Sequence, residues 1–279
     1  MFDAGNSLDA GNSLDAVAGT GLTVRAATVR YGGVVAVSDV DLDVAPGEIV
    51  GLIGPNGAGK TSFIDGVLGF TPRSGEVMID GRDISRSRPH RVARLGLERT
   101  WQSPDLFGDL TVGENIDVGN RPGRPVRTLL ADVFTRRRPI EVPAGILNDF
   151  ELDGRMDAVP STLSLGQQKL LGVARALISN PSVLLLDEPA AGLDSTESQH
   201  LGRHLRTLAD RGLGMLLVDH DMDLVFGICD RVVVLEFGRV IATGTPSEVR
   251  SSPAVMAAYL GAPDVAETLH SSTNAGGTA

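Results

Sequence analysis

The chain has 279 residues, of which 42% are hydrophobic and 22% charged, and both fractions are ordinary for a globular protein. Its formal net charge of −10 argues against broad nucleic-acid binding, which needs a basic surface to neutralise phosphates. The single cysteine, Cys229, excludes an internal disulfide or a cysteine-based zinc cluster, and it is expected to be a small buried residue. No apolar run reaches the ~18 residues that would span a membrane.

The first residues carry a tandem repeat, in which residues 3–8 (Asp-Ala-Gly-Asn-Ser-Leu) recur as residues 9–14. These side chains are small and polar, so they offer little apolar surface to offset the entropy cost of ordering. We therefore predict a disordered tail over residues 1–20 and a second, low-complexity tail over residues 262–279. The folded domain is expected to cover residues 21–261.

The first half of this domain begins with strand patterns. Residues 22–29 and 40–44 alternate apolar and polar side chains, whereas residues 48–53 are almost wholly apolar, as in a central strand covered on both faces. The elements expected next are a helix at 62–68, a strand at 75–80, a helix at 89–97 that carries Val92, Leu95 and Leu97 on one side, and a loop followed by a helix over 101–119.

Residues 120–145 differ in character from the rest of the chain, because six arginines stand among four prolines. They are interpreted either as a solvated, mobile insertion or as a contact with a partner protein or with lipid headgroups.

The second half alternates helices and strands. The expected elements are a helix at 164–179 capped by Ser164, a strand at 182–186, a helix at 195–211, a strand at 214–218, a helix at 221–228, a hairpin of 232–236 and 240–242, and a short helix at 252–260. This alternation predicts an α/β fold with a mostly parallel sheet. Functional residues should then gather at the carboxyl ends of the strands.

A phosphate-binding loop pattern, G-x-x-x-x-G-K-[ST], lies between the strand at 48–53 and the next helix. Its residues are Gly54, Pro55, Asn56, Gly57, Ala58, Gly59, Lys60, Thr61 and Ser62. Glycines let backbone N–H groups approach an anion, and a helix N-terminus favours negative charge. Lys60 can reach the β- and γ-phosphates, and the Thr61 hydroxyl suits Mg²⁺. The loop predicts nucleotide binding, against the simpler alternative of a glycine-rich turn.

Three polar side chains follow two other predicted strands. Asp187 can hold Mg²⁺ opposite Thr61, Glu188 can orient or deprotonate an attacking water, and His220 can contact a γ-phosphate. The simpler alternatives are two solvated carboxylates and a structural histidine. Residues 161–168 are interpreted either as an ordinary capped helix start or as an anion-binding helix N-terminus.

Further motifs surround the phosphate loop in a fixed order along the chain. They are the aromatic Tyr31, Gln102 in Thr-Trp-Gln, residues 163–167 (Leu-Ser-Leu-Gly-Gln), residues 184–189 (Leu-Leu-Leu-Asp-Glu-Pro), residues 191–194 (Ala-Gly-Leu-Asp) and His220. Together with the loop, they resemble the ATP-hydrolysing subunit of ABC transporters over about residues 22–261.

The resemblance implies a P-loop NTPase core with a mostly parallel sheet, an antiparallel β subdomain and a helical subdomain. The core and β subdomain are expected at about residues 21–100 and 171–250, and the helical subdomain at about residues 101–170. It also implies catalytic roles for Glu188, His220, Lys60 and Gln102. The implied Mg²⁺ residues are Thr61, Gln102 and Asp187, and the implied ATP-binding residues outside the loop are Tyr31, Ser164, Gly166, Gln167 and Asp194.

One residue departs from the family pattern, because Leu165 stands where the family usually has glycine. The serine and the second glycine of that motif, Ser164 and Gly166, are retained, so we expect Leu165 to tune activity rather than abolish it.

The family resemblance also implies partners. Two chains, either two copies or this chain and a related ATPase subunit, would sandwich two ATP molecules. Membrane-spanning permease subunits would dock on residues 101–170, a periplasmic or extracellular solute-binding protein would take part indirectly, and no nucleic acid is expected. The chain would lie peripherally on the cytoplasmic face of the inner membrane.

Several segments are similar to the branched-chain amino acid uptake ATPases of bacteria, among them residues 31–33 (Tyr-Gly-Gly), 99–102 (Arg-Thr-Trp-Gln) and 258–261 (Ala-Tyr-Leu-Gly). The ATPases of urea or amide uptake and of lipopolysaccharide export remain alternatives, as does a nucleotide-sensing module without turnover. A GTPase is disfavoured, because the chain has no Asn/Thr-Lys-x-Asp motif after a strand.

Overall fold

A computed structural model describes residues 20–101, 103, 105–119, 150, 152 and 154–259. The predicted tails, apart from Thr20, and the arginine- and proline-rich residues 120–145 lie outside these ranges.

A six-stranded sheet forms the centre of the fold, in the order β10-β9-β3-β8-β7-β6. Its strands are β3 (Ile49–Ile53), β6 (Leu97–Thr100), β7 (Val183–Asp187), β8 (Gly214–Val218), β9 (Arg231–Glu236) and β10 (Arg239–Gly244). All neighbours pair in parallel except β9 and β10, which form an antiparallel hairpin. The predictions of a mostly parallel sheet and of the hairpin are therefore confirmed.

The two faces of this sheet carry two separate cores. Leu184 and Leu186 belong to the core with the helices α6 (Leu165–Leu177), α7 (Ser195–Asp210) and α8 (Met222–Ile228). Val183 and Leu185, which alternate with them, pack instead with the helix α1 (Lys60–Val67) and the smaller sheet. Because both faces are covered, the strands consist of consecutive apolar residues, which is what made them recognisable in the sequence.

A four-stranded antiparallel sheet lies over the second core, in the order β2-β1-β4-β5. It consists of β1 (Leu22–Tyr31), β2 (Val34–Val44), β4 (Arg73–Ile79) and β5 (Arg82–Asp83). The expected strands at 22–29, 40–44 and 75–80 are found, the first two of them longer than predicted, whereas the short β5 was not anticipated.

The predicted helix at 89–97 is partly wrong. The helix α2 covers only Pro89–Arg94, and Leu97–Thr100 is the edge strand β6, paired with β7. Gly96 separates the two elements with a φ of 100°, and a Cβ there would lie 2.8 Å from Ser182 Oγ. The sequence hides this strand because Leu97 is its single apolar residue.

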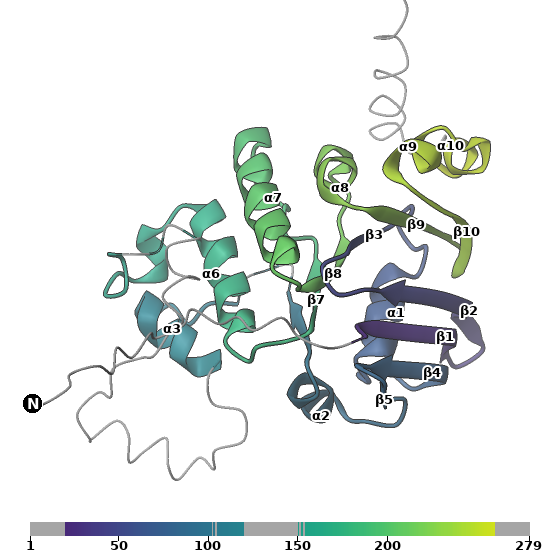
Figure 1. The fold of residues 1–279 in the computed structure, drawn as a ribbon, viewed down its shortest axis with the longest axis horizontal. Helices are drawn as coiled ribbons and strands as arrows, with labels where there is room; N and C mark the ends of the chain where they lie inside the picture. The colour runs from purple at the N-terminus through teal and green to yellow at the C-terminus, as the bar shows by residue number, and fades with distance from the viewer. Residues whose placement is uncertain are drawn as a thin grey trace, which may run out of the picture.

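The remaining helices lie around these sheets. They are α3 (Val112–Gly119), the 3-10 turn η1 (Pro160–Thr162), α9 (Pro246–Arg250) and α10 (Pro253–Tyr259), of which α9 was not predicted. The helix α3 packs against α6 at one end of the molecule, and the antiparallel sheet lies at the other end (Figure 1). Within the described residues, no helix is long and apolar enough to cross a membrane.

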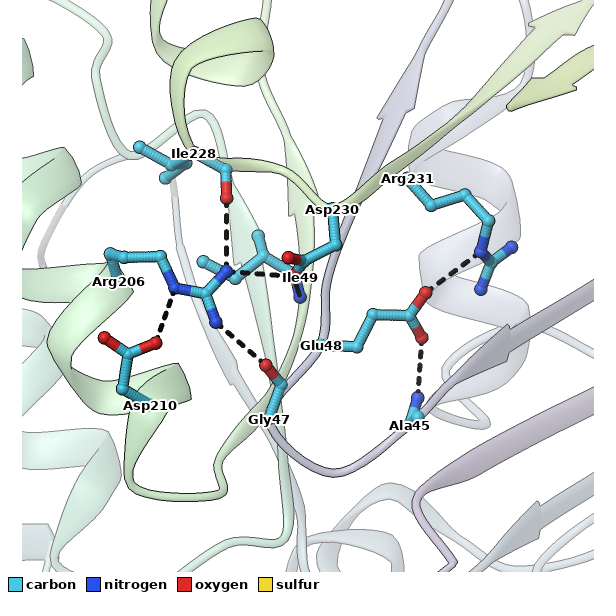
Figure 2. A network of polar contacts seen from close by, with 9 residues as sticks. All are labelled: Ala45, Gly47, Glu48, Ile49, Arg206, Asp210, Ile228, Asp230 and Arg231. Atoms are coloured by element: carbon cyan, nitrogen blue, oxygen red, sulfur yellow. Dashed lines mark hydrogen bonds and ion pairs between the residues drawn. The ribbon is translucent and has the colours of Figure 1, made fainter. Parts of the chain in front are cut away.

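A polar network joins the C-terminal end of α7 to the starts of β3 and β9 (Figure 2). Arg206 donates hydrogen bonds to the Gly47 carbonyl (3.0 Å) and to Asp230 (2.9 Å), whose carboxylate also accepts from the Ile49 N–H (2.8 Å). This network lies where β3 begins, whereas the phosphate loop follows the last residue of β3. The two are therefore at opposite ends of the strands.

Candidate functional site

Three neighbouring parallel strands, β3, β8 and β7, end on the same side of the central sheet, where the polar residues predicted from the sequence gather. The strand β3 leads into the phosphate loop, β7 ends at Asp187, and β8 is followed by Asp219 and His220. The charges of Asp187 and Glu188 act on Lys60 of the phosphate loop. The structure therefore brings together three segments that are far apart in the sequence.

The phosphate loop needs its glycines for steric reasons. Gly54, Gly57 and Gly59 have φ angles of 153°, 80° and 104°, a region that residues with a Cβ rarely adopt. A Cβ on Gly54 would lie 2.2 Å from the Leu235 carbonyl oxygen, and one on Gly59 would lie 2.4 Å from the Ala36 carbonyl oxygen. These contacts come from β2 and from the β9–β10 hairpin, so tertiary packing holds the loop closely curled.

Lys60 is the first residue of α1, and its side chain folds back across the loop. Its Nζ donates hydrogen bonds to the Gly54 (2.6 Å) and Pro55 (3.1 Å) carbonyls. Burial lowers the pKa of Lys60, while the nearby Glu188 and Asp187 carboxylates oppose that shift. A half-buried ammonium at the mouth of a glycine-rich loop fits a polyphosphate ligand, because the negative phosphates would balance the positive charge of Lys60.

The residues expected to hold Mg²⁺ fit that ion by their chemistry. Thr61 follows Lys60 in α1 and is exposed, and Asp187 ends β7 with a largely buried side chain. A hydroxyl and a carboxylate oxygen are hard ligands of the kind Mg²⁺ prefers. Asp187 Oδ2 forms an ion pair with Arg99 Nη2 (2.5 Å), and Arg99 Nη1 forms another with Asp65 Oδ1 (2.6 Å).

Glu188 has an unusual backbone conformation, with a φ of 48° in a residue that is not glycine. Its N–H donates to the Val218 carbonyl (2.7 Å), which ties the residue after β7 to the end of β8. Such strain costs about 1–3 kcal/mol and is often found at functional sites. His220 Nδ1 lies 3.9 Å from Glu188 Oε2, and the imidazole is 70% exposed. The two residues can therefore face the same ligand.

Asp219 is a buried carboxylate that sequence reasoning did not identify as functional. It accepts hydrogen bonds from the N–H groups of Ala190 (2.9 Å), His220 (2.8 Å) and Asp221 (3.0 Å). Burial raises the pKa of Asp219, and these N–H groups oppose the shift. The carboxylate thus fixes the segments that carry Glu188 and His220. Its pattern, an acid at the end of an apolar strand, was present in the sequence but did not distinguish this role.

Ser164 caps α6, as predicted. Its Oγ accepts from the Gln167 N–H (3.2 Å) while Gln167 Oε1 accepts from the Ser164 N–H (3.2 Å), which makes a reciprocal capping box. Ser164 is exposed, and Gly166 and Gln167 are half-buried. Among the described residues, no hydrogen bond or ion pair joins them to the phosphate loop of the same chain.

Asp194 is the N-cap of α7, where its Oδ1 accepts from the N–H groups of Thr196 and Glu197, at 2.8 Å each. Leu165, the departure from the family pattern, is 39% exposed, and its Cδ2 lies 3.2 Å from where a Cβ on Gly192 would stand. The sequence did not indicate the capping by Asp194 or the close approach of Leu165 to Gly192.

The other expected site residues are partly or largely exposed, or lie outside the described residues. Tyr31 ends β1 and is 48% exposed, with its hydroxyl 3.4 Å from Thr71 Oγ1. Asn56 is exposed, whereas Ser62 on α1 is half-buried. Gln102 lies outside the described residues. Lys169, a buried lysine on α6 that the sequence did not single out, donates to the Glu188 carbonyl (3.5 Å).

Two family models match this chain. One, described as ABC transporter, matches residues 37–191. The other, described as branched-chain amino acid ATP-binding cassette transporter, matches residues 239–265.

Curated proteins and solved structures that resemble this chain are also ATP-binding subunits of transport systems. The chain is 38% identical over 250 residues to the high-affinity branched-chain amino acid transport ATP-binding protein BraF of Pseudomonas aeruginosa, covering 86% of this chain and 97% of that protein. It is 36% identical over 241 residues to the lipopolysaccharide export system ATP-binding protein LptB of Escherichia coli, with the same coverage. The ADP conformation of MJ1267, an ATP-binding cassette of an ABC transporter, superposes with a TM-score of 0.78 at 29% identity, covering 86% of this chain and 98% of that one.

Proposed function

The chain belongs to the ABC transporter family and is an ATPase, and from that premise we propose that it powers a bacterial importer of branched-chain amino acids. The observation that carries the ATPase chemistry is the convergence of Lys60, Asp187, Glu188 and His220 on one edge of the sheet. The import assignment is supported by the match of residues 239–265 to the branched-chain amino acid family model.

In the proposed reaction, the phosphate loop binds the phosphates of ATP and Glu188 orients and polarises the attacking water. Lys60 and His220 donate hydrogen bonds to the phosphoryl oxygens, on which negative charge is spread during transfer. Tyr31 would stack on the adenine and Gln102 would contact the γ-phosphate side of the site. Mg²⁺ bound at Thr61, Gln102 and Asp187 would neutralise charge on the phosphates.

The exposed α6 N-terminus supports a site that is shared between two chains. Ser164, Gly166 and Gln167 offer a hydroxyl and N–H groups at a helix N-terminus, which suits an anion. We propose that they contact ATP held by the phosphate loop of a second chain, with Asp194 beside them. A γ-phosphate that bridges both chains attracts them only while it is present, so ATP binding closes the dimer and hydrolysis releases it.

The proposed partners follow from the family. The family's ATPase subunits work with membrane permease subunits and form dimers. For this chain we propose permease docking near residues 101–170, a periplasmic or extracellular solute-binding protein acting indirectly, and a peripheral location on the cytoplasmic face of the inner membrane.

The catalytic part of this proposal is tested by Glu188→Gln. The variant should bind ATP as the wild type does but hydrolyse MgATP about a hundredfold or more slowly, because the general base is lost. The measurement is phosphate release by the purified chain together with equilibrium ATP binding. Glu76→Gln, an exposed glutamate on β4, is the matched control and should keep wild-type turnover. Near-normal turnover of Glu188→Gln would remove that residue from the role of base.

The transport part is tested in lipid vesicles that contain the co-purified permease subunits and the solute-binding protein. Leucine uptake that depends on MgATP, and that is lost with Glu188→Gln, is the expected result. Uptake of urea or an amide instead, or extraction of lipopolysaccharide, would replace the proposed solute. ATP binding without turnover even with the permease present would identify a nucleotide-sensing module.

A further inference from the structure

A buried arginine lies directly behind the carboxylate that we assign to Mg²⁺. Arg99 is on β6, and its register partner on β7 is Leu185, two residues before Asp187. Because side chains alternate along a strand, Leu185 and Asp187 point to the same face of the sheet, and Arg99 beside them does so as well. That face is the one covered by α1, where Leu185 belongs to the core.

Arg99 connects two elements of the site through two short ion pairs. Its Nη2 lies 2.5 Å from Asp187 Oδ2, and its Nη1 lies 2.6 Å from Asp65 Oδ1 on α1. The Arg99 side chain is only 6% exposed. One guanidinium therefore ties the helix that follows the phosphate loop to the strand that ends at the metal carboxylate. The other oxygen, Asp187 Oδ1, accepts no hydrogen bond from any residue that the structure describes, which leaves it available to a metal ion.

The same guanidinium lies against the sole tryptophan of the chain. Arg99 Cζ is 4.1 Å from the centroid of the Trp101 ring, a cation–π arrangement. Trp101 in turn makes an edge contact with Phe70, with ring centroids 5.8 Å apart. Trp101 is 44% exposed, and its contact with the guanidinium makes the indole a reporter of Arg99.

We propose that Arg99 is a positioning residue, which holds Asp187 at the geometry required for the metal by clamping it to Asp65. This inference rests on the proposed function, because it assigns the metal to Asp187. It follows from the planar fork of arginine, whose two terminal nitrogens each hold one carboxylate in a fixed direction. A lysine at the same place is a point charge on a flexible stem and lacks the planar fork, so it cannot hold both carboxylates in fixed directions.

Two effects of Arg99 on the metal act in opposite directions. A cation behind Asp187 repels Mg²⁺, whereas the fixed carboxylate orientation favours it. A neutral substitution removes both effects together and leaves the sign of the change undetermined. Arg99→Lys keeps the charge and removes the fork, so it isolates the contribution of orientation.

The experiment compares Arg99→Lys with the wild type in three measurements. In steady-state hydrolysis, kcat should fall about tenfold while the KM for MgATP changes less than about twofold, since the phosphate loop is intact. In electron paramagnetic resonance of Mn²⁺ binding to the ADP-loaded chain, the dissociation constant should rise about tenfold. The change in Trp101 fluorescence when Mg²⁺ is added to the ADP-loaded chain should be lost.

Arg25→Gln is the matched control. Arg25 also makes a two-nitrogen pair with a carboxylate, Asp43, but that pair is about half exposed and lies in the antiparallel sheet. All three measurements should stay at wild-type values in this control. If Arg99→Lys does not fold, Asp65→Asn takes its place, because it removes the negative charge at the far end of the clamp and leaves Arg99 and Asp187 unchanged. Asp65→Asn should change each measurement in the same direction by a smaller factor.

The outcomes separate this inference from the proposed function. A wild type that hydrolyses MgATP, with a folded Arg99→Lys that matches it in kcat and in Mn²⁺ affinity, overturns the role of Arg99 and leaves the proposed function standing. Equal losses of ADP affinity with and without metal also overturn it, because they indicate a general packing defect. A wild type that neither hydrolyses MgATP nor binds Mn²⁺ with ADP overturns the proposed function itself.

Discussion

At the level of single residues, the proposed site depends on side chains whose partners are distant in sequence. Arg99 meets Asp187 from 88 positions away, and Asp219 accepts the N–H of Ala190 from 29 positions away. The sequence indicates Lys60, Asp187 and Glu188, because each follows an apolar strand and carries a recognisable chemical role. It could not indicate Arg99, and although Asp219 also follows an apolar strand, the sequence did not distinguish its role, since both roles arise only when the strands pair.

Cys229 allows a prediction about reactivity. The thiol is buried as expected, at 8% exposed, and burial raises its pKa from about 9 to about 12. At pH 8 the thiolate fraction is then about a thousandfold lower in the native chain than in the unfolded chain, so iodoacetamide should alkylate the native protein correspondingly slowly. Because Cys229 is the single cysteine, mass spectrometry reads the rate directly, and urea-unfolded protein is the control. Equal rates in both states would contradict the buried environment.

The same pKa shift predicts a dependence of stability on pH. The folded chain holds the thiol proton more tightly than the unfolded chain, so this contribution to the free energy of unfolding is fully present below about pH 9. It is lost as the pH rises from about 9 towards about 12. In Cys229→Ala this alkaline loss should be smaller than in the wild type, as measured by urea unfolding at several pH values.

At the scale of elements, the central strands were predictable and the edge strand was not. The strands β3, β7 and β8 are buried along their whole length, so their composition identifies them. The edge strand β6 has one fully buried residue, Leu97, and its conformation depends on pairing with β7 and on the turn at Gly96. Local sequence carries no comparable signal for such a strand, which is why residues 95–97 were assigned to the preceding helix.

The network at the start of β3 predicts a stability effect without a catalytic one. Arg206→Ala removes hydrogen bonds to the Gly47 carbonyl and to Asp230 (Figure 2), and should lower the free energy of unfolding by about 1–2 kcal/mol. The Asp210 pair adds little to this figure, because Asp210 is 65% exposed. Urea unfolding followed by circular dichroism measures the change.

Arg203→Ala is the matched control for this variant, since Arg203 is exposed on the same helix and should change stability by less than about 0.5 kcal/mol. Both variants should keep wild-type kcat per folded molecule, because the network lies at the opposite edge of the sheet from the phosphate loop. A fall in kcat for folded Arg206→Ala would show that this edge is coupled to the site.

At the scale of the whole molecule, the residues that the family resemblance joins in one ATP site fall into two groups. Lys60, Asp187, Glu188 and His220 gather at the sheet edge, whereas Ser164 and Gly166 are at the start of α6 and make no described polar contact with the phosphate loop. The mostly parallel sheet was predictable because every central strand is an apolar run. The separation of the two groups was implied by the family resemblance, in which two chains sandwich ATP. The residue pattern alone did not indicate it, because it depends on how α3 and α6 pack together beside the sheet.

We propose that one chain's phosphate loop and another chain's Ser164 segment complete each ATP site, so ATP binding should change the oligomeric state. The most direct measurement is analytical ultracentrifugation of Glu188→Gln with and without MgATP, since this variant should retain uncleaved ATP. We expect a monomer without nucleotide and a two-chain complex with MgATP. Gly166→Asp in the same background should abolish the complex by placing a negative charge against the γ-phosphate. A Glu188→Gln chain that is saturated with MgATP and still sediments as a monomer would contradict the shared site.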